Sequence, residues 1–154
     1  SRLTDAFYIG GTKNGALFGE ALVICNNSLK SDFRFLIKQR GALLAKGRTI
    51  GIQFLALFRD NLYFSLARHA NNMASLLRQG IRDAGHAFLS ESPSNQIFPI
   101  FPNRLIQKLL LNFDFYVWKE IDSEHSAVRL VTSWAAEKET MLRFVDAVKS
   151  YQDD

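Results

Sequence analysis

The sequence lacks the features that mark secreted, membrane-spanning or disordered proteins. Its 154 residues contain one cysteine, Cys25, which excludes an internal disulfide framework and fits a reducing compartment. No apolar run reaches the ~18 residues that a membrane span needs, and no signal-peptide pattern opens the chain. Repeats and low-complexity segments are absent, and the charged fraction of 22% is typical of folded proteins. We therefore expect a folded, cytoplasmic protein with no membrane partner.

Charge of one sign is not in large excess either. The net charge of +4 permits an anionic partner but requires none. A basic series opposed by little more than Asp32 runs through residues 30–48: Lys30, Arg34, Lys38, Arg40, Lys46 and Arg48. We expect a solvated helix face here. Interleaved exposed aromatic side chains, on which single-stranded nucleic acids stack, are not expected, so we expect no nucleic-acid partner.

Apolar residues make up 47% of the sequence, enough for one good core. Residues 6–10 form an apolar run that ends in glycine and predict a short buried strand. A second strand is predicted at 18–25, and its unbroken apolar stretch predicts burial on both faces. Two such strands indicate the edge of an α/β sheet covered by helices. Helices are predicted at 27–40, 42–59 and 62–83.

After Gly85, a natural helix C-cap, the pattern changes to short strands and two helices. Strands are predicted at 86–89, 96–101, 115–120 and 127–133, and helices at 102–111 and 136–151. The fold class expected is α/β, ending in a small α+β domain. We expect residues 1–60 to be the end of a large domain with connector helices, and residues 61–154 to be the small domain.

A lysine stands on a tight turn between the first two predicted strands. The run Gly10-Gly11-Thr12-Lys13-Asn14-Gly15 contains a strong Asn-Gly turn signal. Backbone without Cβ atoms at the glycines can approach a bound group closely. From composition alone, however, a solvated loop lysine is the interpretation that we favour.

Arg129 is the second residue of interest. Strand alternation puts it on one face with Ala127 and Val131. A guanidinium among apolar neighbours needs a partner, and its planar fork matches a carboxylate with two hydrogen bonds. The alternative is a structural salt bridge, which the residues alone favour.

The remaining chemically versatile residues give no site. His69, His86 and His125 share no metal-ligand spacing, so we expect no metal. We expect His69 to pack or lie on the surface and the other two histidines to be exposed. Trp118 and Trp134 are interpreted as core or interface aromatics.

The segment 7–15, followed by Phe18-Gly19-Glu20-Ala21, closely resembles the cofactor-lysine segment of low-specificity threonine aldolases. These belong to the aromatic amino acid β-eliminating lyase/threonine aldolase group of fold-type I pyridoxal-phosphate enzymes. The likeness continues through residues 38–41, 69–74 and 128–132, and so covers essentially the whole chain. Family members are roughly twice as long. The resemblance therefore implies the C-terminal part of a fold-type I PLP-dependent transferase-like fold, which we do not expect to be active alone.

The resemblance also implies roles for single residues. Lys13 would hold the cofactor, pyridoxal 5'-phosphate, covalently, with Thr12 and Gly11 beside it. Thr12 would either bond the cofactor or cap the turn. For Lys46 or Arg48 the resemblance implies an alternative to the solvated helix face, in which one of them would reach the cofactor phosphate of a neighbouring subunit. Arg129 would bind the α-carboxylate of an amino acid substrate. The implied reaction is cleavage of threonine or allo-threonine to glycine and an aldehyde, in a homodimer or homotetramer. A β-eliminating lyase of aromatic amino acids and a non-catalytic interaction module remain alternatives.

Overall fold

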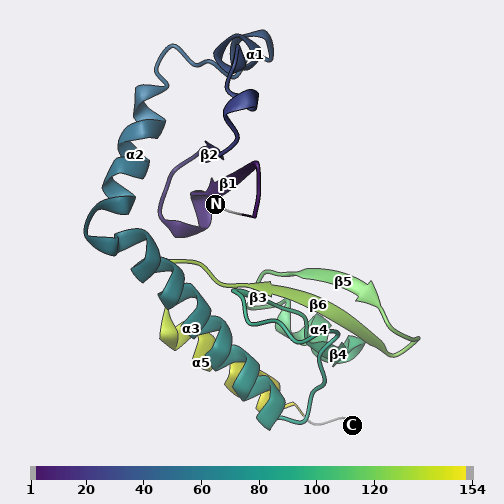
Figure 1. Ribbon diagram of the computed structural model, residues 1–154. Coiled ribbons are helices and arrows are strands. Elements are labelled where there is room, and N and C mark those ends of the chain that lie inside the picture. The colour runs from purple at the N-terminus through teal and green to yellow at the C-terminus, as the bar shows by residue number, and fades with distance from the viewer. Residues whose placement is uncertain (1–2, 152–154) are drawn as a thin grey trace. The chain divides into compact units, whose positions relative to one another are not determined.

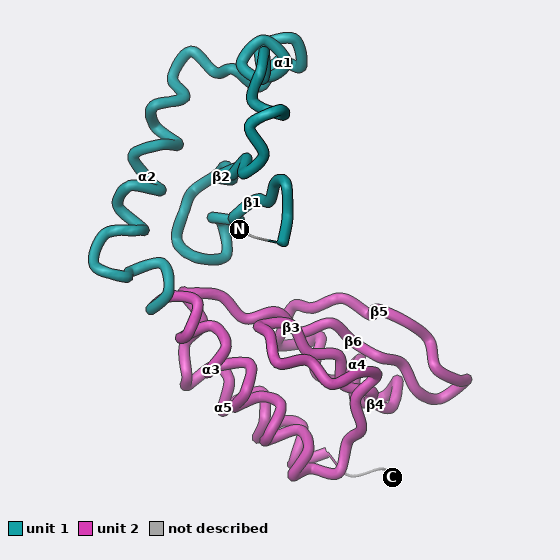
Figure 2. Tube along the Cα trace, viewed as in Figure 1, with its two compact units in different colours: residues 1–65 teal, residues 66–154 magenta. Residues whose placement is uncertain are grey.

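The computed structural model describes residues 3–151. The chain divides into two compact units, residues 1–65 and residues 66–154 (Figure 2). None of the helices in the described part of the chain has the length and apolar character needed to cross a membrane.

Unit 1 begins with an antiparallel hairpin (Figure 1). Strand β1 (Ala6–Gly10) pairs with β2 (Glu20–Ile24), and the single-turn helix η1 (Thr12–Asn14) lies in the connection. The chain then forms η2 (Asn27–Leu29), α1 (Phe33–Gln39) and α2 (Arg48–Phe58). A further single turn, η3 (Arg59–Asn61), leads into α3 (Leu62–Asp83).

The predicted burial of the first two strands is wrong for this structure. Exposed and half-buried residues alternate along β1, and Tyr8 is 70% exposed. The reason is the sheet itself, because within the described residues the hairpin is a two-stranded sheet with no third strand beside it. The predicted sheet edge between helices is therefore reduced to a hairpin.

Two of the three helices predicted in this region also differ from the structure. The helix predicted at 27–40 is divided into η2 and α1, since Asp32 has a left-handed φ of 55° and interrupts it. The Asn26 side chain caps η2 by accepting from the Ser28 amide. Helix α2 begins at Arg48 instead of residue 42, after a turn in which Gly41 has a φ of 71°. Helix α3, in contrast, has the predicted bounds.

Unit 2 is built on a four-stranded antiparallel sheet with β6 (His125–Val131) in its middle. Strand β5 (Tyr116–Glu120) pairs with one edge of β6. The two short strands β3 (Gln96–Ile97) and β4 (Ile100–Pro102) pair with it as well, near its two ends. The strand predicted at 86–89 is only an isolated bridge, from Phe88 to Pro99.

The core of unit 2 lies between this sheet and three helices. These are α3, α4 (Asn103–Leu109) and α5 (Lys138–Lys149). Both apolar strand positions of β6 that face the core, Val128 and Leu130, are buried against them. Figure 1 shows α3 and α5 running alongside each other. They approach so closely at Gly80 that a Cβ there would lie 2.5 Å from both methyl groups of Val145.

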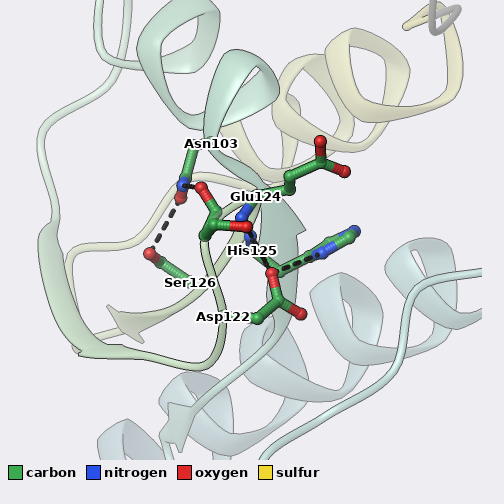
Figure 3. Close-up of polar contacts among 6 residues, drawn as sticks. Asn103, Asp122, Glu124, His125 and Ser126 are labelled. Carbon is green, nitrogen blue, oxygen red and sulfur yellow. Dashed lines mark hydrogen bonds and ion pairs between the residues drawn. The ribbon is translucent and has the colours of Figure 1, made fainter.

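The turn between β5 and β6 is organised by one carboxylate (Figure 3). Asp122 Oδ1 accepts the backbone N–H groups of Glu124 and His125, both at 2.8 Å. His125 Nδ1 lies 3.1 Å from the same oxygen. The backbone hydrogen bond from Glu124, followed by the side-chain bond from His125, lowers the pKa of Asp122. On the neighbouring side, the Ser126 hydroxyl donates to Asn103 Oδ1 at 2.8 Å.

Candidate functional site

Lys13 lies on a closed turn whose backbone is hydrogen-bonded to itself. The amides of Asn14 and Ala16 both donate to the Gly11 carbonyl, at 2.9 and 3.0 Å. Gly15 ends η1 with a φ of 95°, a conformation that favours glycine. The Lys13 side chain is exposed and makes no ion pair or hydrogen bond with any residue in the range 3–151. The turn therefore presents a free primary amine.

Helix α2 holds this turn in place. Gln53 accepts the Leu17 amide on its Oε1 at 2.7 Å. Gly11 is buried so tightly that a Cβ there would lie 2.8 Å from Ala16 Cβ and 3.0 Å from Phe54 Cζ. The polar and apolar contacts come from neighbouring residues of α2. The turn at residues 10–15, here called the lysine turn, is therefore packed against this helix and is not a free loop.

Two further contacts complete the attachment. Ile50, one turn before Phe54, packs against Gly19, since a Cβ on Gly19 would lie 2.8 Å from Ile50 Cγ2. Gly19 also has a φ of 92°. Tyr63 donates from its hydroxyl to the Gly10 carbonyl at 2.8 Å, and its ring stacks on Phe58. Tyr63 and Gln53 were not singled out in the sequence. The sequence pattern that could have identified Gln53 is its position among Ile50, Phe54 and Leu57, since a polar residue on an apolar helix face needs a hydrogen-bond partner.

The other residues of the motif have distinct environments. The Thr12 hydroxyl makes no hydrogen bond within the described chain, and Gly11 is the N-cap of η1, so Thr12 does not cap the turn. At Gly10 a Cβ would meet nothing within 4 Å, which leaves open space beside the backbone. Gly11 instead is required by packing against its own chain. The two glycines therefore serve different purposes.

Arg129 lies in unit 2, on β6, and is half-buried. Its Nε–H donates to Gln96 Oε1 at 3.0 Å, and its guanidinium carbon lies 5.7 Å from the centre of the Trp118 ring. The alternative of a structural salt bridge is not observed, since no carboxylate of residues 3–151 forms an ion pair with Arg129. Arg129 also borders a pocket of about 380 Å³ in unit 2. The pocket's wall is mainly apolar and includes Leu77, Phe113, Met141 and Phe144.

Hydrogen bonds fix the end of the strand that carries Arg129. The buried Thr132 hydroxyl donates to the Ala70 carbonyl of α3 at 2.7 Å. Asn95 Nδ2 donates to the Thr132 carbonyl at 2.7 Å, and the Thr132 amide donates back to the Asn95 carbonyl at 3.0 Å. His69 Nε2 donates to the Ala136 carbonyl at 2.7 Å, so this half-buried histidine is a structural group.

The predictions about other residues have mixed outcomes. His86 is half-buried and not exposed, and its ring lies edge-on to Phe101 at 4.9 Å, whereas the His125 side chain is 42% exposed. Trp118 and Trp134 are 55% and 45% exposed, so of the two interpretations, core or interface aromatics, the core interpretation is wrong and the interface interpretation stays a prediction. Within residues 3–151, no group of three metal-binding side chains is present.

The basic series has the solvated character that was expected, since all six of its cations are exposed. One aromatic residue of the same stretch, Phe35, is 73% exposed, contrary to expectation. A single exposed ring among these cations does not make the interleaved pattern that single-strand binding uses.

Comparison with known proteins relates both units to one kind of enzyme. No family model matches the chain. The low specificity L-threonine aldolase of Pseudomonas aeruginosa is 34% identical over 95 residues, which are 61% of this chain and 28% of that protein. The enzyme of the same name from a Pseudomonas species is 38% identical over 79 residues, or 51% of this chain and 23% of that protein.

A solved structure extends the similarity to almost the whole chain. The threonine aldolase of Leishmania major is 49% identical, with a TM-score of 0.94, over 96% of this chain and 43% of that one. This chain thus spans less than half the length of each of these relatives. In sequence and in fold the chain is similar to part of a threonine aldolase, and its fold class is that of the fold-type I pyridoxal-phosphate enzymes.

Proposed function

We propose that the protein containing this chain is a pyridoxal-phosphate-dependent aldehyde-lyase that cleaves threonine or allo-threonine to glycine and an aldehyde. The observation that carries the proposal is the 49% identity to the Leishmania major enzyme over 96% of this chain. Because the chain covers 43% of that enzyme, the activity is proposed for the complete gene product, with any sequence that flanks these 154 residues.

The residues around Lys13 fit this cofactor. The amine of Lys13 is exposed and unpaired within the described chain, so it is available to the cofactor aldehyde. The open space at Gly10 leaves room for a flat ring beside the backbone. Pyridoxal 5'-phosphate, when bound, supplies an electron sink that stabilises negative charge at the substrate Cα. In this proposal Lys13 holds the cofactor and then, as a free amine, accepts or returns a proton at its Nζ.

Arg129 is proposed to bind the substrate carboxylate. Its two terminal nitrogens have no hydrogen-bond partner in the described chain, and a guanidinium fork matches a carboxylate in two parallel hydrogen bonds. Holding the carboxylate fixes the rotation about the bond between the substrate nitrogen and Cα. This rotation decides which of the bonds at Cα is broken. Cleavage between Cα and Cβ gives glycine and an aldehyde, whereas loss of the α-proton leads to β-elimination.

We further propose that the protein is a cytoplasmic homodimer or homotetramer. Apolar side chains of α2 that face away from the lysine turn support the oligomer, since Ile52 and Leu55 are 54% and 66% exposed. The sedimentation coefficient of the complete gene product tests it, and a monomer at micromolar concentration would contradict it.

The cofactor assignment is tested with the complete gene product. We expect it to turn yellow with pyridoxal phosphate, and borohydride reduction to attach the cofactor to the peptide that carries Lys13. Lys13→Ala should lose the attachment, whereas Lys138→Ala, at an exposed lysine of α5, should keep it. Attachment that survives Lys13→Ala would overturn the assignment.

The reaction is tested by product analysis. We expect glycine from threonine, and neither pyruvate nor phenol from β-substituted substrates such as tyrosine. Pyruvate or phenol in place of glycine would identify a β-eliminating lyase, and no product from either substrate class would favour an interaction module. Arg129→Met should raise the KM for threonine by about 10- to 100-fold, the range for loss of charged hydrogen bonds. An unchanged KM would refute the carboxylate role.

A further inference from the structure

The guanidinium of Arg129 is contacted by residues of two strands that pair with β6, namely β3 and β5. On one side, Gln96 of β3 is paired with Val131, two residues along β6 from Arg129 on the same face of the sheet. Its Oε1 accepts the Nε–H of Arg129 at 3.0 Å. This bond joins two half-buried side chains, so it is made in a partly desolvated setting.

On the other side, an irregularity in β5 brings in an aromatic ring. The register of β5 against β6 shifts between Val117 and Lys119, which makes Trp118 the extra residue of a bulge. A bulge redirects the side chain of its extra residue. The Trp118 ring lies 5.7 Å from the guanidinium carbon of Arg129, and Phe98 packs against that ring at 5.4 Å. This is the geometry of a cation–π contact.

The contacts with Gln96 and Trp118 leave the terminal nitrogens of the guanidinium without a hydrogen-bond partner in the described chain. Of its five N–H groups, the one on Nε is occupied by Gln96, and the four on Nη1 and Nη2 have no hydrogen-bond partner in the described chain. A carboxylate can approach a guanidinium at the edge formed by Nε and one terminal nitrogen, or end-on at the two terminal nitrogens. With Nε already bonded, only the end-on edge offers two free parallel donors.

We propose that Gln96 is a positioning residue, which holds Arg129 so that its two terminal nitrogens receive the substrate carboxylate end-on. The inference rests on the carboxylate-binding role proposed above for Arg129, and it adds the residue that sets the direction of approach. Gln96 does not touch the substrate. It reduces the rotational freedom of the guanidinium before binding, so less conformational entropy is lost when the carboxylate binds.

The test compares two ligands in the complete gene product loaded with pyridoxal phosphate. Glycine carries a carboxylate and methylamine does not, and the binding of each is followed by the change in cofactor absorbance. Gln96→Met keeps the side-chain length and removes the acceptor. We expect it to weaken glycine binding by roughly three- to tenfold, the effect of one net hydrogen bond, and to leave methylamine binding unchanged. The matched control is Gln107→Met, at an exposed glutamine of α4, which should change neither.

A second readout follows the hydrogen bond itself. In the ¹⁵N NMR spectrum of the 154-residue chain, the Nε–H resonance of Arg129 should move and exchange faster with water in Gln96→Met. Gln96→Glu keeps an acceptor, so the resonance should stay protected. Glycine binding should nevertheless weaken, because the added charge competes for the guanidinium.

The outcomes separate this inference from the function on which it rests. If Arg129→Met leaves the preference for glycine over methylamine intact, the carboxylate role of Arg129 is wrong and the inference fails with it. If Arg129→Met removes that preference but Gln96→Met keeps it, only the inference is overturned. Equal weakening of glycine and methylamine in Gln96→Met would show a general structural role and would also overturn it.

Discussion

At the scale of single residues, the two adjacent glycines of the lysine turn, Gly10 and Gly11, differ in how closely other atoms surround them. Gly11 is enclosed by Ala16, Phe54 and the Gly19 carbonyl, with a virtual Cβ between 2.8 and 3.2 Å from each. Gly11→Ala should therefore destabilise the chain by about 1–3 kcal/mol, the usual cost of overpacking. Urea denaturation of the 154-residue chain measures this.

Gly10→Ala is the matched control, because its Cβ would meet nothing within 4 Å. We expect a change of no more than about 0.5 kcal/mol in the free energy of unfolding. Equal destabilisation by the two substitutions would contradict the packing explanation. If Gly10→Ala keeps stability but weakens cofactor binding, the open space at Gly10 is used by the cofactor.

Asp122 predicts a pH dependence of the β5–β6 turn. Its pKa is lowered below its ordinary value of 3.8, first by the Glu124 amide and then by the His125 side chain. A carboxyl group with a lowered folded-state pKa contributes stability above its unfolded pKa, and this contribution is lost as the pH falls through the folded pKa. We expect the carboxyl carbon of Asp122 to titrate below 3.8 in NMR spectra. Asp122→Asn should remove this titration and loosen the turn at neutral pH, and titration above 3.8 would show that the amide bonds are not made.

At the scale of elements, the sequence best predicts the bounds of a helix or strand when the residues that set those bounds lie within or beside it. The bounds of α3 were predicted because apolar positions repeat at three and four residues and Gly85, with a φ of 88°, ends it. The interruption at Asp32 was missed because no sequence rule requires a left-handed aspartate there. The bulge at Trp118 was missed for a related reason, since strand pairing depends on the partner strand.

The close contact of α3 with α5 gives a prediction for an element pair. Gly80→Ala puts a methyl group 2.5 Å from Val145 Cγ1 and Cγ2, which overpacking should make destabilising by about 1–3 kcal/mol despite the better helix propensity of alanine. Val145→Ala leaves a cavity at a site that is 5% exposed, and should cost roughly 2 kcal/mol. The two substitutions together should restore the volume.

A double-mutant cycle on Gly80 and Val145 measures the interaction. We expect the combined substitution to be less destabilising than the sum of the single ones by about 0.5–3 kcal/mol, the coupling expected of residues in contact. Additive effects would mean that the helices separate instead of sharing the space. Alanine at Gly51, where a Cβ would meet nothing within 4 Å, is the control for the propensity term.

At the scale of the whole molecule, burial is distributed unequally between the two units. The contiguous core, from Ala74 to Val148, belongs entirely to unit 2. Among the described residues of unit 1 the buried apolar side chains are Ala16, Phe54 and Leu57, and the first two lie against Gly11 of the lysine turn. The sequences at 6–10 and 21–25 have the continuous apolar character of strands buried on both faces, yet in this structure both strands are partly exposed. An apolar pattern therefore predicts that a strand is buried, but it does not identify the segment that covers the strand.

This inequality predicts a graded pattern of amide hydrogen exchange in the 154-residue chain. The amides of β6 lie in a sheet whose core face is covered by helices, and β1 and β2 form a hairpin with exposed side chains such as Tyr8 and Leu22. Local opening costs least where few apolar contacts are lost, so we expect protection in β1 and β2 to be lower than in β6 by about 100-fold or more. Exchange followed by mass spectrometry tests this with peptides from both units of the same sample. Equal protection of the hairpin and β6 would contradict it, because the hairpin would then be covered by apolar contacts that the described residues do not provide.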